Sequence, residues 1–284
     1  MTQTLTQPRS LTAYMPLTTH PEAAPDEAIR GAIDFALGLG GVLRVTAFAV
    51  DVPQVSSPLG NLLIDVQELV RKVEEKSRAE ARRLCDLVKG FDAPGKVAVA
   101  QRVVVLGAVP DAAAAEARSF DLSVLPWWAG ADTAQDLVQG VVFGSGRPAI
   151  IVPAFAHAVR IDHVAIAWDG SRVAARALGD VLPLLAPGGR VSVLTVTDEK
   201  PLGAEDVAGP LVTALQGRGI TAAPVRITLA GRSIGAAFQE TAMAEGAGLL
   251  AMGGFGHSRF RDFILGGATK AVLAQLSMPV LLSH

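Results

Sequence analysis

A glycine-rich segment near the C-terminal end of the sequence has the residue types of an anion-binding loop. Leu249 to Met252 is a short apolar run typical of a buried strand, and a helical pattern begins near Gly267. Between them lie Gly253, Gly256 and Gly266, where the absence of a side chain lets the backbone approach a phosphate closely. The first N–H groups of a helix have no partner within the helix, and the helix dipole favours negative charge there. The segment therefore predicts a phosphate-binding loop, and the alternative is a glycine-rich connection that binds nothing.

Neither of two common phosphate-binding patterns fits this segment. A P-loop ends in Gly-Lys-Ser/Thr, whereas the run Gly266-Gly267-Ala268-Thr269 has no lysine before a hydroxyl residue. A dinucleotide-binding fingerprint places its glycines within about six residues of the turn. Gly256 and Gly266 are ten positions apart, so this fingerprint is also excluded.

The spacing Gly-x2-Gly-x9-Gly, carried by Gly253, Gly256 and Gly266, resembles the ATP-binding loop of the universal stress protein family. In that family a Ser or Thr commonly follows the third glycine, and a second hydroxyl residue follows two positions later. This chain has Gly267 at the first of these positions and keeps Thr269 at the second. The resemblance therefore implies a backbone cradle with one phosphate-directed hydroxyl instead of two.

A carboxylate follows the first apolar strand of the second half of the chain, in the run Ala167-Trp168-Asp169. In an open parallel sheet, ligands bind beyond the carboxyl ends of the strands, where Asp169 could accept hydrogen bonds from ribose hydroxyls or an exocyclic amine. Its alternative role is to cap the next helix. The resemblance implies that this Asp contacts the nucleoside, that Ala167 and Val196 line an adenine pocket, and that Met252 lies beside the phosphate loop. The candidate nucleotide-binding residues are Ala167, Asp169, Val196, Met252, Gly253, Gly256, Gly266, Gly267, Ala268 and Thr269.

The sequence offers little for catalysis. Phe260 stands where a nucleophile elbow around Ser258 would need a glycine. His257 has no carboxylate or P-loop lysine placed to assist phosphoryl transfer. Arg259 and Arg261 either reach the phosphates as cations or are solvated loop charges. We therefore expect no catalytic residue and no protein-held metal, with Mg²⁺ arriving only as the companion of a bound ATP.

Apolar strand patterns alternate with helical patterns twice along the 284 residues. Strands are expected at 11–17, 43–50, 96–105, 121–125 and 149–152, and again at 163–168, 190–196, 221–229, 249–252 and 280–283. Helices are expected at 26–39, 62–89, 110–119, 136–144, 172–185, 204–216, 233–246 and from 267, with Asp26 and Ser233 as caps. This alternation predicts an α/β fold of two tandem flavodoxin-like (Rossmann-like) domains, each a five-stranded parallel sheet with helices on both faces.

The two halves of the chain read as copies of one another. Residues 145–152 match 276–283 at an offset of 131, and residues 44–50 match 190–196 at an offset of 146. The domain boundaries are therefore expected at 1–153 and 161–284, with a linker between them. In universal stress proteins the fifth strands of two domains pair antiparallel, which implies that 149–152 and 280–283 meet as an intrachain pseudo-dimer.

The first half lacks the residues of the predicted site. It has Pro126-Trp127-Trp128 where the second half has its first glycine, and Gln135 near the end of the corresponding loop. Proline has no N–H group, and the indoles would occupy phosphate space. The run Pro16-Leu17-Thr18 stands where a carboxylate would be needed. The first half is therefore expected to be a degenerate copy that binds no nucleotide.

Composition excludes several classes of protein. The net charge is −2 and charged residues make up 18% of the chain, without the basic block that nucleic-acid binding needs. No run of about 18 apolar residues predicts a membrane span, and the first residues lack the apolar core of a signal peptide. The single cysteine, Cys85, falls in a helical pattern and is expected to be buried, which favours a reducing cytoplasm.

The sequence thus predicts a cytoplasmic protein that binds an adenine nucleotide in its second half and acts in stress response or signalling. A homodimer of such tandem chains is compatible with this prediction. Two alternatives stay open: a weak ATP hydrolase, and a partner-binding scaffold that works without nucleotide.

Overall fold

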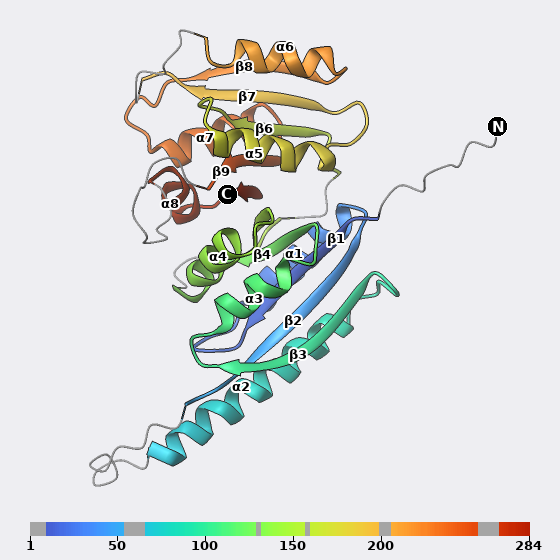
Figure 1. Ribbon diagram of the computed structural model, residues 1–284, viewed down its shortest axis with the longest axis vertical. Coiled ribbons are helices and arrows are strands. Elements are labelled where there is room, and N and C mark those ends of the chain that lie inside the picture. Colours follow the sequence, from blue (N-terminus) through green and yellow to red (C-terminus); the bar gives the residue numbers. More distant parts are fainter. Residues whose placement is uncertain (1–9, 54–65, 129–131, 157–159, 199–205, 255–266) are drawn as a thin grey trace, which may run out of the picture.

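In the computed structural model, ten strands form one continuous sheet in the order β3-β2-β1-β4-β5-β10-β9-β6-β7-β8 (Figure 1). The structure describes residues 10–53, 66–128, 132–156, 160–198, 206–254 and 267–284. The strands are β1 (Thr12–Thr18), β2 (Val42–Asp51), β3 (Val97–Val105), β4 (Leu122–Trp127), β5 (Ala149–Pro153), β6 (His163–Ala167), β7 (Arg190–Val196), β8 (Thr221–Ile227), β9 (Leu249–Gly253) and β10 (Val280–Ser283).

Helices cover both faces of this sheet. They are α1 (Asp26–Gly38), α2 (Val66–Lys89), α3 (Val109–Ala117), α4 (Asp132–Gly144), α5 (Arg172–Val181), α6 (Gly209–Gly217), α7 (Ile234–Ala244) and α8 (Gly267–Ala274), with a short 3₁₀ turn at Leu182–Leu184. The buried residues of α1, α2, α5 and α6 share one core, and those of α3, α4, α7 and α8 share the core on the opposite face. The predicted α/β architecture is confirmed.

One pair of neighbouring strands sets the relation between the two halves. Within the described residues every neighbouring pair is parallel except β5 and β10, which pair antiparallel. Ile151 pairs with Val280 and Ala149 with Leu282. The expected meeting of 149–152 with 280–283 is therefore confirmed, and each half contributes five strands in the same internal order.

The long helix α2 has one buried apolar side and one exposed charged side. Its inner stripe of Ala81, Leu84, Cys85 and Val88 is buried, as expected for Cys85. Burial raises the pKa of the Cys85 thiol. The charged residues lie outside this stripe and form pairs such as Lys72–Glu68 and Arg71–Glu75 on an exposed face. Charge pairs four residues apart are typical of a solvated helix face.

Two helix ends differ from expectation for identifiable reasons. Helix α5 stops at Val181 instead of residue 185 because Pro183 lacks an N–H group and its ring clashes with the preceding turn, so the chain continues as a 3₁₀ turn. Asp26 does not cap α1, since the N-cap position is Pro25 and Asp26 lies in the first turn. The predicted cap Ser233 is confirmed, with its side chain accepting a hydrogen bond from the Ala236 N–H.

A buried histidine lies at the start of β6. His163 is 2% exposed, and its Nε2 lies 2.9 Å from Ser192 Oγ on β7. Burial and the nearby Arg190 guanidinium lower the pKa of His163, outweighing the opposite influence of the Gly246 carbonyl and the Glu245 carboxylate. The folded protein therefore favours neutral His163.

This burial predicts a loss of stability in mild acid. Below the ordinary His pKa of about 6.5, His163 binds a proton in the unfolded chain but resists it in the folded protein. The free energy of unfolding should therefore fall as the pH is lowered, by at most about 1.4 kcal/mol per pH unit for this group. Urea unfolding between pH 7.5 and 5.5 should show a shallower decline for His163→Gln than for wild type. The two proteins should run parallel above pH 7.5, and equal slopes in acid would contradict the assignment.

Candidate functional site

The strand order reverses direction between β6 and β9. From β6 the chain proceeds to β7 on one side, and from β9 it proceeds to β10 on the other side. Their register places Ile166 beside Ala251, so Ala167, the last residue of β6, and Met252, one residue before the end of β9, lie at the same edge. Helix crossovers diverge above such a point and leave room for a ligand at the carboxyl ends of the strands.

Apolar side chains line this edge on one face of the sheet. Met252 and Val196 are 4% and 8% exposed and belong to the core beneath α7 and α8. Ala167 is half-buried, packs against the same core, and pairs with Leu194 in the register of β6 and β7. The structure therefore places Ala167, Val196 and Met252 on the same face of the sheet.

Asp169 lies two residues beyond β6, and its side chain is exposed. Its Oδ1 accepts a hydrogen bond from the Ser171 N–H at 2.9 Å, which closes a tight turn through Gly170 at a φ of +75°. The cap of α5 is Ser171, because its side chain accepts from the Ala174 N–H at 3.2 Å. The alternative role of Asp169 as a helix cap is therefore wrong, and Ser171, which the sequence analysis overlooked, fills that role.

Trp168 holds the turn in place. Its backbone N–H donates to the Leu194 carbonyl at 2.8 Å, and its indole Nε1 donates to the Val207 carbonyl at 3.0 Å. Thr195 Oγ1 donates to the Trp168 carbonyl at 3.3 Å. These bonds tie the end of β6 to β7 and to the start of α6, so the position of Asp169 is set by three neighbouring segments.

Gly253 ends β9 in close contact with α5. A Cβ at this position would lie 2.6 Å from Val173 Cγ2 and 2.8 Å from the Val173 carbonyl carbon. Its neighbour Gly254 donates a backbone hydrogen bond to the Ser283 carbonyl at 2.7 Å, and a Cβ there would lie 3.3 Å from Val142 of the first half. Packing alone thus requires a glycine at 253, whatever the ligand.

The first turn of α8 faces the start of the glycine-rich segment. Thr269 is 2% exposed, and its Oγ1 lies 3.5 Å from the Gly254 carbonyl, at the long limit of a hydrogen bond. Gly267 is exposed, and a Cβ there would meet nothing within 4 Å. The two ends of the predicted loop therefore lie at the same strand edge, next to Ala268, which packs against the core.

Helix α7 fixes the position of α8. A Cβ on Gly235 would overlap the backbone of Ala271 and Val272, so the two helices cross in direct contact. Gln239 is 1% exposed, and its Nε2 donates to the carbonyls of Val272 and Gln275 at 3.4 and 3.1 Å. The C-terminal turn of α8, and with it the direction of the helix, is thus held by a buried amide that the sequence analysis did not single out.

Several predicted residues of the loop lie outside the described residues. These are Gly256 and Gly266, together with His257, Arg259 and Arg261. The predictions made for them stay predictions. Of the ten candidate residues, the structure places the other eight at or beside the carboxyl edge of β6, β7 and β9.

Comparisons with known proteins identify the second half. Residues 160–284 match the model of the universal stress protein family. They belong to that family. The whole fold is similar to that of a universal stress protein from Archaeoglobus fulgidus DSM 4304, with 18% identity, a TM-score of 0.64 and 95% of each chain covered. It is also similar to a functionally unknown protein from Pseudomonas aeruginosa PAO1, with 12% identity, a TM-score of 0.52, and 95% of this chain and 92% of the other covered. No curated protein matches the sequence.

The corresponding edge of the first half differs from the universal stress domain. Thr19 follows β1, and its Oγ1 donates to the Phe48 carbonyl at 2.7 Å and lies 2.6 Å from Ser77 Oγ of α2. Ser77 Oγ in turn accepts from the Val50 N–H at 2.9 Å. Thr19 and Ser77 are 4% and 1% exposed. Side chains of the first half therefore fill the space between the ends of β1 and β2.

The strand register corrects the position compared with Asp169. The offset of 146 makes Phe48 equivalent to Leu194, and these residues pair with Thr18 and Ala167, respectively. Asp169 therefore corresponds to His20 and not to the run 16–18 considered in the sequence analysis. The first half still has no carboxylate at this position.

The first half also differs at the strand that carries Gly253. The offset of 131 relates Val152 to Ser283, which pair with Pro126 and Gly253, respectively, so Pro126 is the equivalent of Gly253. Pro126 is buried near the end of β4. Trp127 packs against the core beneath α3 and α4, whereas Trp128 packs against the core on the other face. The two indoles are thus part of the packing of the first half.

Among the described residues, neither a membrane-spanning helix nor a metal-binding cluster is present. None of the described helices combines the length and apolarity needed to cross a lipid bilayer. Across the described ranges, no group of three or more His, Cys, Asp or Glu side chains is arranged to hold a metal ion.

The close approach of α5 predicts the effect of a methyl group at Gly253. Gly253→Ala should destabilise the protein by about 1–3 kcal/mol without any ligand, because the new Cβ meets both the side chain and the backbone of Val173. Val173→Ala should recover part of this loss in the double variant, since it removes the closest atom. Urea unfolding measures all three free energies.

Gly267→Ala is the matched control, since its Cβ would meet nothing within 4 Å and its φ is not in the left-handed region. We expect its free energy of unfolding to stay within about 1 kcal/mol of wild type. Equal losses at positions 253 and 267 would show that packing against Val173 is not what requires the glycine.

Proposed function

We propose that this universal stress protein binds one adenine nucleotide per chain, in its second half, and acts in stress response or signalling. The observation that carries the proposal is the convergence of Ala167, Asp169 and Met252 at the point where the strand order reverses. An apolar wall lies on one side of this edge, and an exposed carboxylate follows the neighbouring strand. A flat base with a hydroxyl-bearing sugar has the matching chemistry.

The phosphate end of the proposal rests on α8 and the glycines before it. Backbone N–H groups at a helix start attract anions, and Gly267 leaves the first turn of α8 open on its outer side. Thr269 Oγ1 forms only a long contact with Gly254, so it can turn to a phosphate oxygen at little cost. Ser283 adds a buried hydroxyl that finds no partner among the described residues. The backbone carbonyl of Ser283 accepts from the Gly254 N–H, so this residue lies at the start of the glycine-rich segment. These residues fit a nucleotide phosphate chain, with Mg²⁺ accompanying a triphosphate.

The same proposal assigns no catalysis and a cytoplasmic location. The described carboxylate of the site, Asp169, already accepts the Ser171 N–H and lies at the nucleoside end, away from the phosphates. ATP hydrolysis would therefore be slow and incidental to binding. The buried, unreactive Cys85 suits a reducing compartment. A nucleotide-independent scaffold is the competing function, and it differs in predicting no response to nucleotide.

We predict one nucleotide site per chain. Isothermal titration with ATP and Mg²⁺ should give one site, and ATP at 100 times its dissociation constant should raise the free energy of unfolding by about 2.7 kcal/mol. Gly256→Val should abolish this binding while the circular dichroism spectrum stays unchanged, because a side chain blocks the approach of phosphates. Two equal sites would contradict the assignment of the first half, and a melting temperature indifferent to ATP, ADP and AMP would favour the scaffold.

A second set of variants separates the two ends of the nucleotide. Asp169→Ala should weaken ATP, AMP and adenosine alike by about 1.5–3 kcal/mol, as expected for a hydrogen bond to a charged group. Thr269→Ala should weaken ATP more than adenosine, and Gly267→Ser should tighten ATP but not adenosine, since its Cβ has open space.

Asp169→Asn is the matched control for the turn. Its amide oxygen can still accept the Ser171 N–H, so the local fold is kept while the charge is lost. If the turn alone mattered, the Asn variant would bind adenosine as wild type does. Equal affinities in all these variants, with folding verified, would show that the residues serve only chain geometry.

A further inference from the structure

The two edges of the ten-stranded sheet are built differently. One edge is β8, whose sequence Thr221–Ile227 contains Pro224 in its centre. The other edge is β3, whose nine residues Val97–Val105 contain no proline. An exposed edge strand offers unpaired N–H and C=O groups to another strand, and a proline at such an edge blocks pairing. Only β8 carries this protection.

Hydrogen bonds to the neighbouring strands show which residues face outward. The Thr197 N–H donates to the Ile227 carbonyl, so Ile227 faces β7 and Pro224, three residues earlier, faces away from it. On β3, the carbonyl of Lys96 accepts from Leu43, and the N–H of Leu106 donates to Asp51. The backbone N–H and C=O groups of the even-numbered residues therefore point toward β2. Those of the odd-numbered residues from 97 to 105 point away from β2, toward the open edge.

Gln101 is the counterpart of Pro224. Gln101 pairs with Ala47 and Pro224 pairs with Val193, and the offset of 146 relates Ala47 to Val193. The first half thus has an outward N–H where the second half has a proline ring.

The side chains of the outward-facing residues are symmetric about Gln101. They are Val97, Val99, Gln101, Val103 and Val105. An antiparallel partner centred on Gln101 would set Val99 opposite Val103 and Val97 opposite Val105, and the two Gln101 amides opposite each other. Valine pairs of this kind stabilise antiparallel strands, and no like charges would meet on this face.

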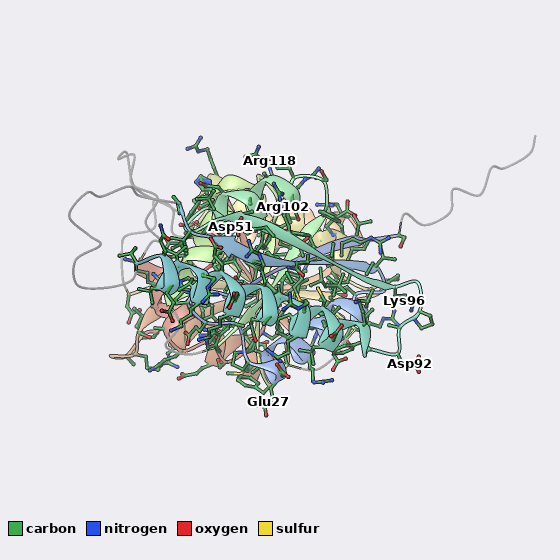
Figure 2. All side chains as sticks on the ribbon, turned by 90° about the horizontal axis from the view of Figure 1, so that it is seen from below. Glu27, Asp51, Asp92, Lys96, Arg102 and Arg118 are labelled. Atoms are coloured by element: carbon green, nitrogen blue, oxygen red, sulfur yellow. The ribbon has the colours of Figure 1, made fainter. Side chains whose placement is uncertain are left out.

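Arg102, the single charged residue within β3, does not lie on the face that carries the valines. Arg102 Nη1 donates to Glu116 Oε1 of α3 at 2.6 Å, and Glu116 also accepts from Tyr14 and Thr46 inside the first half. Burial raises the pKa of Glu116, but these hydrogen bonds outweigh it and hold the pKa below its usual range. Arg102 is therefore neutralised by its own subunit, on the face opposite to the valines. Figure 2 views this end of the molecule, with Arg102 labelled on β3 and α2 beside it.

Exposed apolar side chains gather at this end of the sheet. Among the described residues, five of the seven exposed large hydrophobic side chains lie on β3, just after it, or on the first turns of α2: Val103, Val105, Leu106, Val66 and Leu69, which are 44%, 52%, 39%, 43% and 57% exposed. Helix α2 packs beside β3, and its first turns follow the strand end of β2 (Figure 1). Val103 and Val105 lie on the open edge strand itself, and exposed apolar side chains on such an edge favour association.

We propose that two copies of the chain associate through β3, antiparallel, with Gln101 of each copy on the two-fold axis. The valines are arranged symmetrically about Gln101, which favours a second copy of the chain as the partner. In an antiparallel pair of identical strands, Val99 lies against Val103 of the partner subunit, and Val103 lies against Val99 of the partner subunit. Pairing joins the two sheets into one and covers Val103 and Val105. The β8 edge stays free because Pro224 removes a central donor.

Sedimentation velocity of the full chain between about 1 and 100 μM tests this surface. Wild type should sediment as a dimer at the upper concentrations. Gln101→Pro should be monomeric throughout, because it removes the central donor of both strands as Pro224 does on β8. Gln101→Ala, which keeps the N–H group, should remain a dimer. Gln101→Pro loses no bond to β2, so its circular dichroism spectrum should match wild type, and its ATP titration should match wild type too.

Site-specific cross-linking gives the register independently of stability. In a Cys85→Ala background, Gln101→Cys should be joined to its copy by a short bis-maleimide, and Thr221→Cys on the β8 edge should not. A monomeric wild type at all concentrations would overturn the proposal. So would a dimer that persists in Gln101→Pro or that fails to cross-link at position 101, since either result means another surface.

Discussion

The antiparallel pairing of β5 with β10 is the constraint on which the arrangement of the molecule depends. Val280, Leu281 and Leu282 are fully buried, as are Ala149 and Ile150 opposite them, so the junction is as apolar as the interior of either half. Separating the halves would expose these strands and leave their backbone groups without partners. Two five-stranded sheets therefore behave as one sheet, with one core on each face.

This pairing also decides where ligand sites can lie. Because β5 and β10 run in opposite directions, the carboxyl ends of the strands point to one edge in the first half and to the opposite edge in the second. The halves cannot share a site between their strand ends, and each must build its own. At one edge Ser77 and Thr19 close the space with their own hydrogen bonds. At the other, the Asp169 side chain is exposed, and Gly267 leaves the outer side of the first turn of α8 open.

Sequence reasoning succeeded where one short segment contained all the information. The strands Arg190–Val196 and Val280–Ser283 were predicted to the residue, because each is an apolar run bounded by glycine, proline or polar residues. It failed where a second element decides. Sequence alone leaves the role of Asp169 open between a nucleoside contact and the cap of α5, since Asp169 and Ser171 stand two residues apart and both residue types can cap a helix. The contact of Gly253 with Val173, and the clamp of Gln239 on α8, join residues too far apart in sequence for any pattern to show.

Gly253 shows why a glycine spacing alone is weak support for a ligand site. A Cβ at this position would overlap Val173, so a glycine would be required there even in a relative that binds no ligand. The first half carries the buried Pro126 at the equivalent position, so the helix that follows β1 cannot approach β4 there as α5 approaches β9. Gly267 is the opposite case, since neither packing nor φ demands a glycine. The positions that argue for a nucleotide are therefore those that packing does not require: Asp169, whose exposed side chain accepts from its own turn, and Thr269, whose buried hydroxyl forms a long contact with Gly254. The exposed carboxylate of Asp169 distinguishes this edge of the second half from the corresponding edge of the first, where Thr19 and Ser77 are buried and bonded to each other.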